Sequence, residues 1–280
     1  MPRTLTRLDV EVPGTEAPVK ARLYRTSATR ERALVWVHGG AFAYGDIDMP
    51  EADAVAGWLA ERGCAVLSVD YRLAAPYGDD AVPGIEGHPF PAAHHDVVAA
   101  FDWMVSHAAD LGTTGDSVLL GGASAGANLS AGAAVALRDR GEATPAGLLL
   151  AYPIVHAAVP DPSPAVAQAL ATLPADMRFS ADVIRGMNLN YVGGDEAILR
   201  DPRAFAGEGD VAGLPPTIIV DSEADDLRPS GERFAAQLEA AGVGSTHHVE
   251  PGTTHGHLNR PEEPAFALTL TRFLEWSASR

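Results

Sequence analysis

The pattern of hydrophobic and polar positions alternates between two kinds of segment along most of this chain. Short runs that are apolar at nearly every position predict strands buried on both faces of a parallel sheet. Longer segments with apolar residues three or four positions apart predict amphipathic helices. Strands are expected at 8–12, 21–25, 33–38, 65–70, 118–120, 148–154, 216–221 and 246–250, and helices at 51–62, 88–105, 128–138, 229–241 and 264–276.

This alternation predicts an α/β fold, in which a mostly parallel eight-stranded sheet is covered by helices on both faces. The first two strands are expected to be separated by a turn at Pro13-Gly14. Residues 76–87, rich in Gly, Pro and Asp, predict a long loop of the kind that is often functional. Residues 155–213 show weak periodicity and are interpreted as a small helical cap inserted over the sheet. We therefore expect one domain, 1–280, with this insertion.

The composition of the chain disfavours several classes of protein. The net charge of −17 disfavours binding to nucleic acid and to anionic membranes. No apolar run is long enough for a membrane span, and the first ten residues do not resemble a signal peptide. The single cysteine, Cys64, has no partner for an internal disulfide. These features predict a soluble, cytoplasmic protein and leave its oligomeric state open, a homodimer included.

The chain carries a candidate nucleophile in Gly122-Ala123-Ser124-Ala125-Gly126, a G-x-S-x-G stretch between a predicted strand and a predicted helix. This is the context of a nucleophile elbow, a sharp turn that lifts the serine hydroxyl above the sheet. Side chains at Gly122 or Gly126 would collide with the elements that the turn brings close. The helix N-terminus beneath Ser124 would favour developing negative charge.

A serine nucleophile also needs a base, a carboxylate that orients the base, and donors for an oxyanion. Asp225 and His255 follow the last two predicted strands, in the order Ser, Asp, His, so their loops should meet beside Ser124. Asp226 is the alternative to Asp225, since either could instead cap the following helix. We expect Gly39, Gly40 and Ala125 to supply the oxyanion N–H groups, with His38 bracing that loop by hydrogen bonding.

Taken together, these motifs resemble the hormone-sensitive-lipase-like (bacterial family IV) esterases of the α/β-hydrolase fold. The resemblance implies the triad Ser124, Asp225 and His255 and the oxyanion donors Gly39, Gly40 and Ala125. The chain departs from the family at Ala41, where a third glycine is usual. The matching pieces are His38-Gly39-Gly40-Ala41-Phe42, Tyr71-Arg72-Leu73-Ala74, Phe90-Pro91-Ala92-Ala93 with Asp96, the elbow with Asn128, Asp225-Asp226-Leu227-Arg228, and His255-Gly256.

The expected activity is therefore carboxylester hydrolysis of short-chain, small-molecule esters through an acyl-enzyme, with no cofactor. Hydrolysis of lactones or amides, or acyl transfer to an alcohol, stays open because the same triad serves each reaction. A non-catalytic ligand-binding relative, like the plant gibberellin receptors that resemble this family, is the further alternative.

Four more residues are candidates for substrate contact. Phe42, Tyr44 and Tyr191 could line a pocket, although buried aromatics are more often core. His257 is interpreted as a surface or pocket-wall histidine, with a catalytic or substrate role as the alternative. No metal site is expected, because neither His255-Gly256-His257 nor His94-His95 is accompanied by a ligand cluster with recognisable spacing.

Overall fold

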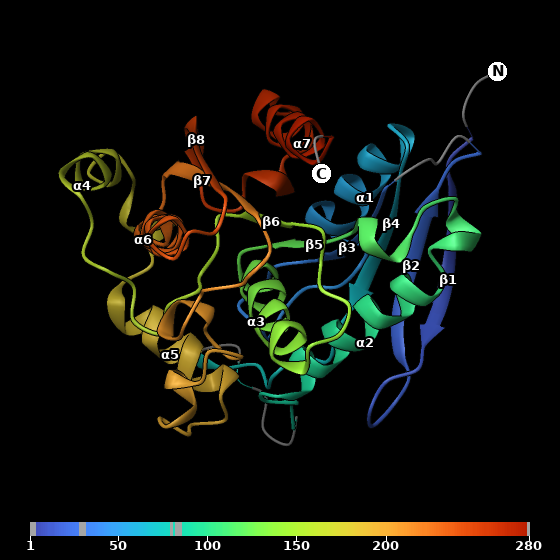
Figure 1. Cartoon of the computed structure of the whole chain (residues 1–280). Helices are drawn as coiled ribbons and strands as arrows, with labels where there is room; N and C mark the ends of the chain where they lie inside the picture. The colour runs from blue at the N-terminus through green and yellow to red at the C-terminus, as the bar shows by residue number, and fades with distance from the viewer. Residues whose placement is uncertain (1–3, 28–31, 79–80, 82–85, 279–280) are drawn as a thin grey trace.

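The computed structural model describes residues 4–27, 32–78, 81 and 86–278, and it contains an eight-stranded sheet (Figure 1). The strand order is β1-β2-β4-β3-β5-β6-β7-β8. β1 pairs with β2, and β2 with β4, in antiparallel fashion, whereas all the other neighbours are parallel. The predicted α/β fold is confirmed. The strands are β1 (Thr6–Val12), β2 (Val19–Arg25), β3 (Arg32–Val37), β4 (Cys64–Asp70), β5 (Val118–Ala123), β6 (Leu148–Ala151), β7 (Thr217–Ala224) and β8 (Ser245–Thr254).

Several strand boundaries differ from the sequence prediction. The connection between β1 and β2 spans residues 13–18, so it is longer than the Pro13-Gly14 turn. β6 ends at Ala151 because Tyr152 has a φ of 36°, which leaves the extended conformation, although the chain stays buried through Ile154. β8 continues to Thr254, through Pro251-Gly252, a pair that is typical of a turn.

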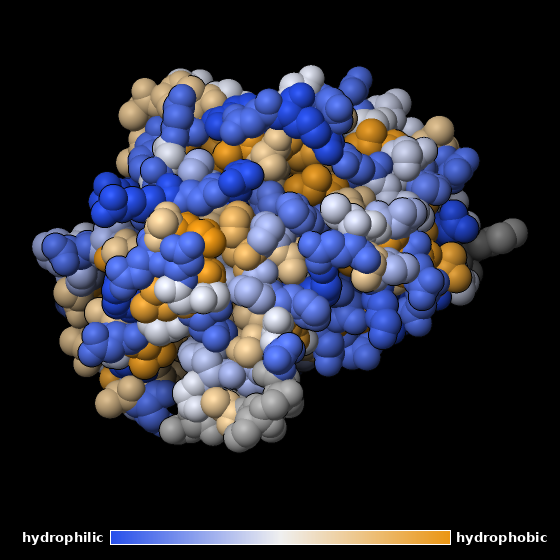
Figure 2. All heavy atoms as spheres, turned by 90° about the horizontal axis from the view of Figure 1, so that it is seen from below, coloured by the Kyte–Doolittle hydropathy of each residue, from blue (hydrophilic) through white to orange (hydrophobic). Residues whose placement is uncertain are grey.

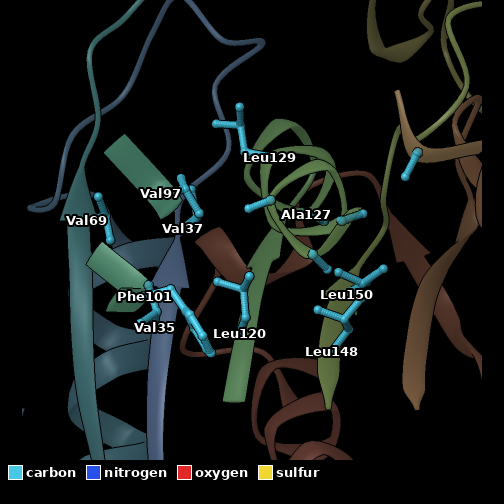
Figure 3. Close-up of a cluster of buried hydrophobic side chains, with 14 of the residues drawn as sticks. Val35, Val37, Val69, Val97, Phe101, Leu120, Ala127, Leu129, Leu148 and Leu150 are labelled. Carbon is cyan, nitrogen blue, oxygen red and sulfur yellow. The ribbon is translucent and has the colours of Figure 1, made fainter. Parts of the chain in front are cut away.

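Helices cover both faces of the sheet, as predicted. α1 (Pro50–Glu61) and α7 (Pro264–Ser277) pack on one face, where Trp36, Leu59 and Phe273 form part of a buried cluster. α2 (Ala92–Ser106), α3 (Ala125–Arg140) and α6 (Arg228–Ala240) contribute to the cluster on the other face. Figure 3 shows side chains of β3, β5 and β6 pointing toward those of α2 and α3. The predicted helices are thus present, with α2 beginning at Ala92 and α3 directly after Ser124.

The segment between β6 and β7 contains α4 (Pro164–Leu170) and α5 (Ala181–Tyr191), which lie at the β7–β8 end of the molecule (Figure 1). Ser163 and Ser180 cap these helices by accepting hydrogen bonds from Val166 and Val183.

Within the predicted loop 76–87, residues 79–80 and 82–85 lie outside the described residues. The short 3-10 helices are η2 (Ala109–Leu111), η3 (Gly115–Ser117), η4 (Ala175–Met177), η5 (Ile198–Arg200), η6 (Ala206–Glu208) and η7 (His257–Asn259).

None of the helices in the described part of the chain combines the length and the apolar character that crossing a membrane would need.

Candidate active site

The parallel strands bring the predicted catalytic residues to one edge of the sheet. Ser124 follows β5, Asp225 follows β7 and His255 follows β8. His38-Gly39-Gly40 follows β3, which pairs with β5. Because the carboxyl ends of parallel strands lie at the same edge, four loops that are distant in sequence meet there.

Ser124 lies on a sharp turn between β5 and α3. Its φ of 54° and ψ of −117° are unusual for a residue with a side chain, and such strain is typical of a nucleophile elbow. The elbow also requires glycine at two positions. A Cβ at Gly122 would lie 2.5 Å from the Val37 carbonyl oxygen, and one at Gly126 would lie 2.1 Å from it. The turn therefore packs directly against the end of β3.

Ser124, His255 and Asp225 form a continuous chain of hydrogen bonds. Ser124 Oγ lies 2.9 Å from His255 Nε2, and His255 Nδ1 lies 2.7 Å from Asp225 Oδ2. The Asp225 side chain is fully buried and also accepts a hydrogen bond from Leu227 N–H. Burial acts to lower the pKa of His255, but the charge and hydrogen bond of Asp225 outweigh it, so this pKa is raised above 6.5. The geometry suits a base that takes a proton from the serine hydroxyl.

The loop after β3 presents free donors, but not those that the sequence predicts. Gly39 N–H donates to Glu51 Oε1 at 2.7 Å, so this N–H group points away from a substrate oxygen. Gly40 and Ala41 instead line the cavity at Ser124, and their N–H groups donate to no atom in the described part of the chain. Ala125 begins α3, so its N–H has no partner within the helix. The available donors are Gly40, Ala41 and Ala125, which corrects the expectation for Gly39.

Aromatic and polar contacts of His38 and Tyr71 stabilise the same loop. His38 Nδ1 lies 2.6 Å from the Gly39 carbonyl oxygen, and the His38 ring stacks on Tyr71 at 4.4 Å. The Tyr71 hydroxyl donates to the His38 carbonyl oxygen. Ala41 has a φ of 52°, the left-handed region that glycine adopts without strain, which explains why a third glycine suits this position.

A cavity of about 280 Å³ opens above Ser124. One wall comes from α5 through Val183, Ile184 and Met187, and another from Tyr44 and Tyr77. Phe179, just before α5, packs its ring edge against His255 at 5.3 Å between centroids. The wall is thus largely apolar, and the segment between β6 and β7 supplies a substantial part of it.

Comparisons with known proteins identify the family of this chain. A family model described as the alpha/beta hydrolase fold matches residues 34–259. Carboxylesterase NlhH of Mycobacterium tuberculosis is 34% identical over 250 residues, which cover 88% of this chain and 72% of the relative. The chain belongs to the alpha/beta hydrolase fold family.

Two further matches support the narrower resemblance. An esterase of Pyrobaculum calidifontis superposes with a TM-score of 0.83 at 30% identity, covering 98% of this chain and 85% of that one. Hormone-sensitive lipase of Bos taurus is 35% identical over 136 residues, which cover 48% of this chain and 16% of the lipase. This alpha/beta hydrolase is therefore a member of the hormone-sensitive-lipase-like group.

Of the four residues predicted to contact substrate, only Tyr44 lines the cavity of this hydrolase. Phe42 and Tyr191 are buried and stack on each other at 3.9 Å, so they belong to the core. His257 is fully buried between Ser222 Oγ and Thr269 Oγ1, at 2.9 and 2.8 Å, and burial lowers its pKa to about 3. Both ring nitrogens are occupied, which is the pattern of a structural histidine.

Glu51, Phe179 and Tyr77 also line this site, although no motif in the sequence points to them. Glu51 is almost fully buried, at 2% exposure, although it occupies the first turn of α1, where an acidic residue is ordinarily a solvated one. Phe179 lies in the weakly periodic insertion, which offers no register for its side chain. Within the described part of the chain, no group of three or more His, Cys, Asp or Glu side chains could hold a metal ion.

Proposed function

We propose that this protein is a serine carboxylester hydrolase that acts on small-molecule esters with short acyl groups. The observation that carries the proposal is the hydrogen-bonded chain from Ser124 through His255 to Asp225, with the serine held on a strained elbow. The names of the relatives, a carboxylesterase and an esterase among them, support the same class of reaction.

In the proposed reaction, Ser124 Oγ attacks the ester carbonyl carbon while His255 Nε2 accepts its proton. Asp225 holds the imidazole in the required tautomer and stabilises the imidazolium. The imidazolium then protonates the alcohol oxygen, the carbon–oxygen bond breaks, and the alcohol leaves an acyl-serine. A water molecule, deprotonated by His255, releases the acid and restores the serine.

Negative charge develops on the carbonyl oxygen during both halves of the reaction. We assign its stabilisation to the N–H groups of Gly40, Ala41 and Ala125. Each such donor is worth about 10²–10³ in rate where one has been removed from a comparable site. The N-terminus of α3 beneath Ser124 adds a favourable dipole.

We also propose that residues 155–213 form a cap on a single domain and shape the substrate site. The support is the contribution of Phe179, Val183, Ile184 and Met187 to the cavity wall. A cavity of about 280 Å³ lined by these residues suits a short acyl group better than an extended one.

The deciding experiment compares Ser124→Ala with the unaltered protein on p-nitrophenyl acetate. Loss of a triad nucleophile costs about 10⁴–10⁶ in kcat. Because the substitution removes one oxygen atom from the cavity floor, thermal unfolding should occur at nearly the same temperature. A folded Ser124→Ala protein with turnover near that of the unaltered protein would refute the assignment.

A further inference from the structure

A second cavity adjoins the one above Ser124. This groove has a volume of about 470 Å³ and lies between the chain at 157–162, the start of α5 and the N-terminal end of α6. Phe179 and Ile184 line both cavities, so these two residues lie between the groove and the cavity at Ser124. Its wall combines small or apolar residues with polar ones. The apolar part includes Ala157, Val159, Pro160, Leu170, Ala181 and Pro229, and the polar part is Asp161, Arg178, Ser180, Asp182, Arg185 and Asp226.

Phe179, the partition between the two cavities, is held in place by the neighbour of the triad carboxylate. Phe179 N–H donates to Asp226 Oδ2 at 2.8 Å. The preceding residue, Arg178, donates to both oxygens of the same carboxylate, from Nε and from a terminal nitrogen. Bidentate pairs of this kind fix geometry as well as charge. The partition is therefore positioned by the same turn that carries Asp225.

The Phe179 side of the site is where the alcohol must leave. The carbonyl oxygen belongs at Gly40 and Ala41, whereas the alcohol oxygen must come within hydrogen-bond reach of His255 Nε2. Phe179 packs against that imidazole, edge to face. A substituent on the alcohol oxygen therefore runs along Phe179, which also lines the groove.

We infer that this groove is the subsite for the alcohol portion of the ester, an inference that rests on the proposed function. The lining favours an uncharged, bulky apolar alcohol such as an arylalkyl alcohol. An anionic substituent is disfavoured, because Arg178 pairs with Asp226, Arg185 pairs with Glu196, and the other two charged residues of the lining, Asp161 and Asp182, are acidic. Figure 2 shows hydrophobic residues at several places on this face, some of them on the side of the molecule that carries α5. In the sequence around the start of α5, Met177, Phe179 and Val183 are exposed at 47%, 38% and 50%.

The test compares two acetate esters that share one acyl group, ethyl acetate and 2-phenylethyl acetate. Each methylene-sized group that leaves water adds about fourfold to kcat/KM if it is fully desolvated. We expect 2-phenylethyl acetate to exceed ethyl acetate by about tenfold or more. Ala181→Trp and Ala158→Trp each place an indole in the groove, and Ala240→Trp on the exposed end of α6 is the matched control.

The measured quantity is the ratio of kcat/KM for the two esters. This ratio should fall about fivefold or more in Ala181→Trp and in Ala158→Trp, and should keep its original value in Ala240→Trp. An unchanged ratio in both groove variants, or an equal loss on both esters, overturns the subsite. If the unaltered protein hydrolyses neither ester nor p-nitrophenyl acetate, the proposed function itself fails, which is a different result.

Discussion

The backbone N–H of Gly39 donates a hydrogen bond of 2.7 Å to the carboxylate of Glu51, a buried residue of α1. The other oxygen of this carboxylate accepts from the Tyr152 hydroxyl and from Asn259 Nδ2. Glu51 thus connects the oxyanion loop, the end of β6 and the turn that follows His255. Burial raises the pKa of the Glu51 carboxyl above its ordinary value, and the three donors that converge on it oppose this shift.

The first prediction follows from that convergence. In Glu51→Gln, one carboxylate oxygen becomes an amide N–H₂ group, which faces either Gly39 N–H or the Tyr152 and Asn259 donors, so the network that anchors the oxyanion loop should weaken. We expect kcat on p-nitrophenyl acetate to fall about tenfold to a hundredfold, within the range for a disturbed oxyanion donor. Glu239→Gln, at an exposed position of α6, is the control and should retain its activity.

Glu51 should also act on His255 through its charge, which raises the pKa of that imidazole. Removal of the charge lowers this pKa, so the acid limb of kcat/KM in Glu51→Gln should move to lower pH. If kcat falls but the acid limb of kcat/KM stays at the same pH, the role of Glu51 is purely structural.

In the unaltered enzyme, the acid limb of kcat/KM should have its midpoint above pH 6.5. His255 must be neutral to accept the serine proton, and Asp225 raises the pKa of its conjugate acid. Activity is therefore expected to rise as pH increases through this raised value. Initial rates from pH 5 to 9 with an ester that is stable over that range measure the midpoint. A midpoint well below 6.5 would contradict the electrostatic role of Asp225.

The two neighbouring carboxylates should differ sharply in their effect on rate. Asp225→Asn reverses the hydrogen bond to His255 Nδ1, and the corresponding change costs about 10⁴ in a serine protease. Asp226→Asn weakens the attachment of Arg178 and Phe179, so it should lose far less rate and should mainly alter the preference among alcohols. Comparable losses of kcat in the two variants would mean that the roles are assigned to the wrong residues.

The elbow should tolerate no side chain at Gly126. A Cβ there would lie 2.1 Å from the Val37 carbonyl oxygen and 2.3 Å from that of His38, so Gly126→Ala must shift β3 or α3. We expect a loss of about 1–3 kcal/mol in the free energy of unfolding, measured in urea. Gly186→Ala on α5 is the control, because its Cβ would meet nothing within 4 Å. That helical substitution should instead stabilise the protein by up to about 1 kcal/mol.

Acyl specificity should favour short chains. The cavity of about 280 Å³ is closed on one side by Tyr44 and Tyr77 and on another by Ile184 and Met187. A methylene group that does not fit in the cavity stays in water and does not strengthen binding. Each one that is buried makes the binding free energy more favourable by about 0.8 kcal/mol. In a series of p-nitrophenyl esters, kcat/KM should reach its maximum at a short acyl chain and decline beyond it. A maximum of kcat/KM on long-chain esters would contradict this prediction, because it would require a long apolar tunnel for the acyl chain.

The alternation of apolar runs and amphipathic helices was sufficient to predict the fold. Strands such as β3 and β5 are hydrophobic throughout because both of their faces are covered, and that pattern is visible along the chain. Order along the chain also indicated the candidate triad, with Asp225 and Asp226 as alternatives for the acid. Residues that follow strands of a parallel sheet converge at one edge, wherever they stand in the sequence. The choice between the two carboxylates rests on the structure, in which Asp225 contacts His255 and Asp226 pairs with Arg178.

Tertiary structure decided what surrounds those residues. Periodicity reports that a segment is buried, but not what it meets, so Phe42, Tyr191 and His257 could not be distinguished from residues of the pocket wall. The direction of an N–H group depends on φ and ψ, which is why Gly39 turned toward Glu51 while Gly40 and Ala41 faced the cavity. Glu51 and Phe179 reach the site from a helix start and from an aperiodic insertion. Their positions follow from packing between distant segments, and no local pattern of residues encodes these positions.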